Sequence, residues 1–92
     1  MPPNPAPKRL KTAPELERMI FNEMCRHAIC AGVAAVTVRE SQAQPGTNWE
    51  VVHINALGGT VAPACRAICR SIAERLQEEF ELLPEFEWDM DF

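Results

Sequence analysis

Apolar residues recur every three or four positions in two segments of the chain, which is the spacing of an amphipathic helix. In the first segment, Leu16, Ile20 and Met24 fall on one face. It begins at Thr12 with the sequence TAPE, in which a threonine and a glutamate three residues later can cap a helix N-terminus. The pattern predicts a helix from Thr12 to about Ala28.

The second helical segment lies between two glycines and Pro84 and is the longest periodic stretch of the sequence. Thr60 can cap it, but a residue before a proline resists helical angles, so Pro63 is an equally good start. The helix is expected to end at Pro84. The positions predicted to face the core are Val61, Cys65, Ile68, Ile72, Leu76, Phe80 and Leu83.

Between the helices, the stretches VAAVTVRE and WEVVHINAL are rich in β-branched residues and predict two strands of an antiparallel hairpin. We expect Val38 to lie opposite Ile54, with a three-residue turn near Pro45 and Gly46. The predicted core face then holds Val36, Val38, Val52, Ile54 and Ala56. The opposite, mixed face holds Thr37, Arg39, Val51, His53 and Asn55, with Trp49 near the turn.

These elements predict a small α+β fold, a two-layer α-β-β-α domain in which an antiparallel hairpin packs against two helices. The domain is expected to span residues 12–84. Residues 1–11 carry four prolines and are expected to be a disordered, basic tail. Residues 85–92 read EFEWDMDF and are either a third strand or an acidic, aromatic interaction tail. The tail is favoured because seven acids follow from Glu78 onward, and a strand would stack its carboxylates along one face without a basic neighbour.

Composition narrows the class of protein. The chain has 47% hydrophobic and 24% charged residues, which is typical of a globular domain. Its formal net charge is -4, and only the short head with Lys8, Arg9 and Lys11 supplies a concentrated basic footprint for phosphates, so nucleic-acid binding is disfavoured. No apolar run approaches the length of a membrane helix. We expect a cytoplasmic protein that needs no cofactor.

The four cysteines are interpreted as reduced thiols, because cysteine behaves as a small hydrophobe in cores. Cys65 and Cys69 share a helix face, whereas Cys25 and Cys30 flank His27 at a spacing unlike paired zinc ligands. A Cys30–His27 pair would require the first helix to continue beyond its expected end. Neither a metal centre nor cysteine catalysis is therefore predicted, and an enzyme is the third alternative.

One candidate binding site is the turn before the second helix. Gly58, Gly59 and Thr60 precede the helix N-terminus, and Arg66 and Arg70 follow one and two turns later. Free amides, the helix dipole and guanidinium groups are the ingredients of an anion site. The sequence lacks the lysine and the glycine spacing of known phosphate loops. A plain turn followed by a solvated helix face is the competing interpretation.

The second candidate surface is for another protein. Trp49 and His53 are expected on the mixed face of the hairpin, and the tail supplies Phe86, Trp88, Met90 and Phe92. We predict a non-enzymatic protein-interaction module that forms a homodimer, because two strands are marginal alone. The alternative is a binder of a small anionic or nucleotide-like ligand at the turn from Gly58 to Arg70.

Overall fold

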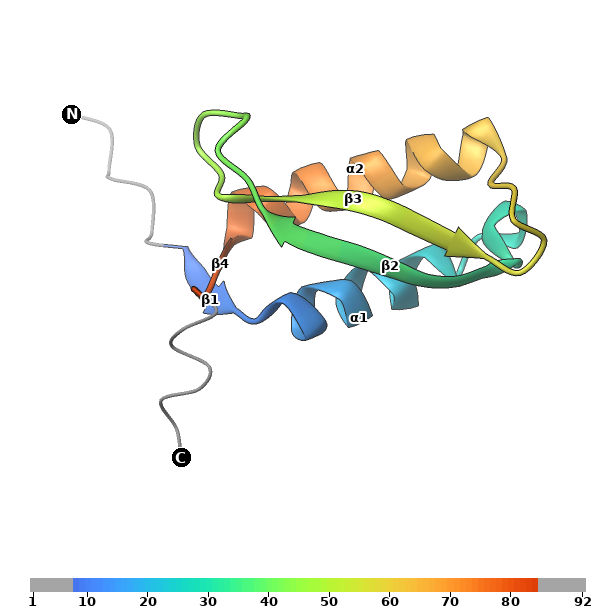
Figure 1. The fold of residues 1–92 in the computed structure, drawn as a ribbon, viewed down its shortest axis with the longest axis horizontal. Helices are drawn as coiled ribbons and strands as arrows, with labels where there is room; N and C mark the ends of the chain where they lie inside the picture. Colours follow the sequence, from blue (N-terminus) through green and yellow to red (C-terminus); the bar gives the residue numbers. More distant parts are fainter. Residues whose placement is uncertain (1–7, 85–92) are drawn as a thin grey trace.

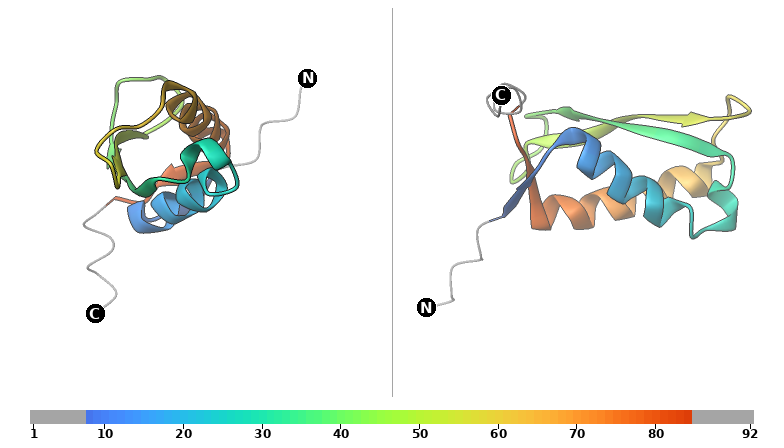
Figure 2. Two further views of the ribbon diagram at one scale, coloured as in Figure 1. Left: turned by 90° about the vertical axis from the view of Figure 1, so that its right-hand side faces the viewer. Right: turned by 90° about the horizontal axis from the view of Figure 1, so that it is seen from below.

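The computed structural model describes residues 8–84, which form two layers (Figure 1). Both helices lie on the same side of a two-stranded hairpin (Figure 2). The predicted α+β class and the packing of the hairpin on two helices are confirmed. In chain order the elements are β1 (Arg9–Lys11), α1 (Ala13–Met24), the 3-10 turn η1 (Ala28–Cys30), β2 (Val33–Glu40), β3 (Trp49–Ala56), α2 (Pro63–Glu79) and β4 (Phe80–Leu82).

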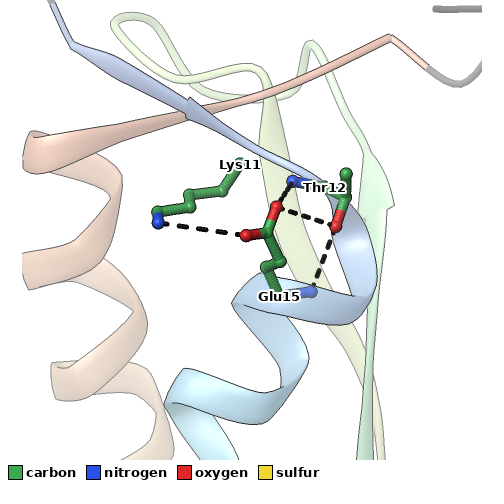
Figure 3. A network of polar contacts seen from close by, with 3 residues as sticks. All are labelled: Lys11, Thr12 and Glu15. Carbon is green, nitrogen blue, oxygen red and sulfur yellow. Dashed lines mark hydrogen bonds and ion pairs between the residues drawn. The ribbon is translucent and has the colours of Figure 1, made fainter. Parts of the chain in front are cut away.

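Helix α1 begins as predicted, with Thr12 as its N-cap. Glu15 donates its N–H to Thr12 Oγ1 at 3.3 Å, and Thr12 donates its N–H to Glu15 Oε1 at 3.0 Å (Figure 3). The helix ends at Met24 rather than near Ala28. Arg26 donates its N–H to Glu23 O, three residues back, so the last turn tightens and the chain leaves the helical path.

The two hairpin strands have the predicted bounds to within a residue, but their register differs. Val36, not Val38, lies opposite Ile54, and Val38 lies opposite Val51. The register shifts twice, which leaves Ala34 and Val52 as extra residues. Each bulge reverses the inward and outward alternation of its strand. The loop spans residues 41–48 instead of a three-residue turn.

The bulge at Val52 corrects three predictions about the faces of β3, those for Trp49, Val51 and Val52. Trp49 was expected on the mixed face, yet its side chain is 0% exposed and lies in the core. Val51 packs against the core as well, whereas Val52 is 48% exposed. Since strand parity inverts at the bulge, Trp49 and Val51 share the core face with Ile54.

Helix α2 begins at Pro63, the second of the two predicted starts, with Ala62 as N-cap. It ends at Glu79, not at Pro84, because Phe80–Leu82 becomes β4 and pairs in parallel with β1. This pairing also corrects the expected start of the domain, since Arg9–Lys11 forms a strand. Residues 1–7 and 85–92 lie outside the described residues, so the tail prediction is not addressed.

Two side chains fix β4 against the start of β3. The Asn48 side-chain amide donates to Leu82 O at 3.0 Å and accepts from Leu82 N–H at 2.8 Å. Trp49 donates its indole N–H to Phe80 O at 3.0 Å. Tertiary contacts therefore convert the end of a helical pattern into a strand.

A disulfide joins η1 to the first turns of α2. Cys30 and Cys65 are bonded, with their Cα atoms 5.3 Å apart and their side chains 1% exposed. The expectation of four reduced cysteines differs from the structure at this pair, because η1 brings Cys30 against α2. Cys69 is a buried thiol as expected, whereas Cys25 is exposed. No helix within residues 8–84 has the length and hydropathy needed to cross a bilayer.

Candidate binding groove

A groove of about 340 Å³ runs between β3 and α2. Its lining includes one stripe of the helix, at positions 66, 69, 70, 73, 74 and 77, and residues 50–54 of the strand. Cys69 and Ala73 are buried, and Val51 and Ile54 are half-buried, so they form an apolar floor. The side chains of Arg66, Arg70, Glu74 and His53 are exposed and form polar rims.

The outer edge of β3 faces this groove. Within residues 8–84, β3 pairs with β2 alone. Gln77 on α2 donates its side-chain N–H to Trp49 O at 2.7 Å, which places the helix alongside this edge. An edge strand carries backbone groups that can pair with another chain unless something covers them.

Ladder geometry shows which backbone groups of β3 point into the groove. In an antiparallel pair, opposite residues either bond to each other or point their N–H and C=O groups outward, in alternation. Val38 donates its N–H to Glu17 Oε2 on α1 at 2.8 Å, although it lies opposite Val51. Val38 and Val51 are thus an outward-pointing pair, and the N–H and C=O groups of Val51 face the groove.

The two helices therefore hydrogen-bond to different extents with the outer edges of β2 and β3. Glu17 on α1 covers the Val38 amide on the β2 edge. On the β3 edge, Gln77 covers the carbonyl of Trp49, and the Thr47 hydroxyl contacts the same residue. The next outward-pointing residue is Val51, which lines the groove. A strand segment placed there would find one donor and one acceptor beside an apolar floor.

Positive charge gathers at one end of the groove. Arg66 and Arg70 lie one helical turn apart, and neither forms an ion pair with any residue in 8–84. By contrast, Arg75 on another face of α2 pairs with Glu23 of α1, which raises the pKa of Arg75. Glu74 and Glu50 line the other half of the groove. The free guanidinium groups give the groove an end that attracts carboxylates.

The cysteines supply no reactive group to the groove. Burial raises the pKa of the Cys69 thiol, which disfavours the thiolate that a nucleophile needs. Cys30 is bonded to Cys65, so it has no thiol to offer His27. Among residues 8–84 no three His, Cys, Asp or Glu side chains come together as a metal site.

The structure divides the two predicted sets of site residues. Arg66 and Arg70 line the groove together with His53, which had been assigned to a different surface. Gly58, Gly59 and Thr60 are exposed and are not among the lining residues. Trp49 lies in the core and offers no surface. Phe86, Trp88, Met90 and Phe92 lie outside the described residues.

Sequence reasoning did not identify the floor of the groove or the side of it that β3 forms. A helical spacing of three to four relates Arg66 and Arg70 to Ala73 and Gln77, so the stripe could be found by extending the arginine pair along the helix. No comparable signal places Val51 beside them, because the bulge at Val52 decides its orientation.

Comparisons with models of protein families, with characterised proteins and with solved structures found no match to this chain. The groove itself is therefore the basis for a function.

Proposed function

We propose that the protein is a non-enzymatic interaction module that binds an extended, acidic segment of a partner protein in the β3–α2 groove. The observation that carries this proposal is the combination, in one groove, of an uncovered strand edge at Val51 with Arg66 and Arg70, which form no ion pair within residues 8–84. Added strands gain affinity from main-chain hydrogen bonds and specificity from alternate side chains.

The chemistry of the groove defines the preferred ligand. A bound strand directs every second side chain to one face. Apolar side chains on that face would contact Val51, Ile54 and Ala73. The acidic side chains between them point to the other face, where the long side chains of Arg66 and Arg70 at the rim would pair with them. The expected ligand alternates apolar and acidic residues over about six to eight positions.

A direct test uses three synthetic octapeptides: alternating Glu–Val, alternating Lys–Val, and a scrambled Glu–Val sequence. We expect the alternating acidic peptide to bind best and to shift the amide resonances of residues 50–54. The double variant Arg66→Glu/Arg70→Glu should lose this preference. The matched control is Arg18→Glu/Arg26→Glu, which makes the same charge change at exposed positions on and just after α1. Equal binding of all three peptides, or shifts elsewhere, would refute the proposal.

The second candidate function is binding of a small anionic or nucleotide-like ligand. Its support is that Arg66, Arg70 and His53 line one groove, whose volume is within the usual range of small-molecule sites. A screen of pyrophosphate and nucleoside phosphates by thermal shift tests this function. A rise in melting temperature that Arg66→Ala abolishes would support it, and no shift would reject it.

The cytoplasmic location expected from composition stays a prediction. Disulfides are rare in the cytosol, so the Cys30–Cys65 bond bears on this prediction. Measuring whether the two cysteines are oxidised in the native protein would test the location.

A further inference from the structure

The β3–α2 groove requires a ligand with three properties: an extended backbone, apolar side chains at every second position, and carboxylates on the alternate positions. The floor formed by Val51, Ile54, Cys69 and Ala73 sets the second requirement, and the rim formed by Arg66 and Arg70 sets the third. One stretch of this chain has all of the required side chains.

That stretch is residues 85–92, EFEWDMDF. Four aromatic or methionine side chains alternate with four carboxylates, and no basic residue interrupts them. A strand of this sequence would present Phe86, Trp88, Met90 and Phe92 on one face. Large side chains of this kind fill apolar grooves and contribute most of the energy of many interfaces.

We propose that the groove binds residues 85–92 of a second copy of the chain, and that mutual exchange of these segments forms a homodimer. The inference rests on the proposed function, since it requires that the groove accept an extended segment. Exchange between two copies gives each groove one segment and satisfies a two-fold axis.

The path of β4 favours exchange over binding within one chain. Leu82 donates its N–H to the Asn48 side chain and accepts a hydrogen bond from that side chain at its C=O. Leu83 donates its N–H to Lys11 O. Strand β4 thus crosses from the end of α2 toward β1 and does not run back along α2 (Figure 1). A segment entering the groove of its own chain would have to reverse direction just after Pro84. The segment of a neighbouring molecule has no such constraint.

Charge favours the same occupant. Residues 85–92 carry four negative charges, and the two arginines on the groove rim have no ion pair within residues 8–84. Paired carboxylates and guanidinium groups across an interface fix the register of the partner and disfavour ligands of the wrong charge.

The test is a complementation experiment with two full-length variants. The groove variant is Arg66→Glu/Arg70→Glu, and the segment variant is Phe86→Ser/Trp88→Ser. We expect the parent to sediment as a dimer at micromolar concentration. Each variant alone should associate at least about tenfold more weakly, because like charges oppose binding in the groove variant and the apolar anchors are lost in the segment variant. An equimolar mixture should associate more tightly than either variant alone and less tightly than the parent, since a mixed dimer keeps one of the two groove–segment pairs intact.

The controls separate the possible failures. Melting temperatures near that of the parent establish that both variants are folded, and Arg18→Glu/Arg26→Glu should dimerise as the parent does. A monomeric parent, variants that remain dimeric, or a mixture that does not associate would each overturn the exchange. If the segment variant nevertheless binds the Glu–Val octapeptide at residues 50–54, the proposed function survives. If it binds no peptide, both proposals fail.

Discussion

At the scale of single residues, the N-terminus of α1 shows how one carboxylate stabilises a local structure. Glu15 accepts hydrogen bonds from the backbone N–H and the hydroxyl of Thr12, and Lys11 lies 3.9 Å from its other oxygen (Figure 3). These bonds, the backbone bond foremost, lower the pKa of Glu15. The ionised form is therefore favoured in the folded protein.

The consequence is a pH dependence of stability. Because the folded pKa of Glu15 is depressed, its contribution is present above the ordinary glutamate pKa of about 4.3 and is lost as the pH falls through the folded value. We expect Glu15→Gln to flatten this part of the profile. Thr12→Ala should lower the free energy of unfolding by about 1 kcal/mol at pH 7. Urea unfolding between pH 2 and 7 measures both, and identical profiles for parent and Glu15→Gln would contradict the assignment.

Cys69 has the opposite effect at alkaline pH. Burial raises the pKa of its thiol, so the unfolded chain ionises first as the pH rises. Its contribution to stability is thus complete below the ordinary thiol pKa of about 8.5 and declines above it. We predict that Cys69→Ala removes part of the alkaline decline. Unfolding measured from pH 7 to 10.5 provides the comparison, and equal slopes in the parent and the variant would reject the prediction.

At the scale of elements, periodicity identified both helices and both strands of the hairpin, but it placed their ends less well. The Thr12 cap and Pro63 are local signals, and the structure keeps both as helix starts. The end of α2 is a tertiary event, because Leu82 pairs with β1 and with Asn48. The helical spacing of apolar residues continues through Phe80 and gives no indication that this segment pairs with β1 and Asn48.

The bulge at Val52 limits what sequence could establish about the groove. Arg66 and Arg70 were identified from the charge and spacing of α2, and both line the groove. Val51 was assigned to the wrong face, because strict alternation fails wherever an extra residue enters a strand. Nothing in the residues around Val52 distinguishes it from an ordinary strand position.

Asn48 permits a test of how β4 is held. Its side chain satisfies both the N–H and the C=O of Leu82, in the manner of a neighbouring strand. We predict that Asn48→Ala lowers the free energy of unfolding by about 1–3 kcal/mol, since two partly buried backbone groups lose their partner. Gln42→Ala, at an exposed position of the same loop, should change it little. Chemical denaturation checks the values, and equal stability of the two variants would show that β4 does not depend on Asn48.

At the scale of the whole molecule, two different devices fasten the helices at opposite ends of the hairpin. At one end β1 and β4 pair, and Asn48 and Trp49 bind β4. At the other end, the Cys30–Cys65 disulfide joins η1 to the start of α2. The groove lies between these fastenings, along the middle of α2. Between the two ends α2 lies beside β3, where Gln77 binds the edge carbonyl of Trp49 and Val51 lines the groove.

The disulfide should therefore determine both stability and the shape of one groove end. The bond closes a loop with a sequence separation of 35, for which chain entropy predicts about 4 kcal/mol at most and typical values are about 2–4 kcal/mol. We expect reduction, or the variant Cys30→Ala/Cys65→Ala, to lower the free energy of unfolding by that order. Arg66 follows Cys65 directly, so amide exchange should accelerate most in η1 and the first turns of α2. The β1–β4 end should change least.

Thiol counting fixes the starting state of this experiment. The oxidised protein should show two titratable thiols after denaturation without reductant, Cys25 and Cys69, and four after reduction. Binding of the Glu–Val octapeptide should weaken on reduction, because the arginine end of the groove loses its anchor, whereas Cys25→Ala should leave it unchanged. If reduction accelerates exchange equally at both ends, α2 is held as one unit by the core. The disulfide would then be a stabilising bond with no particular influence on the groove.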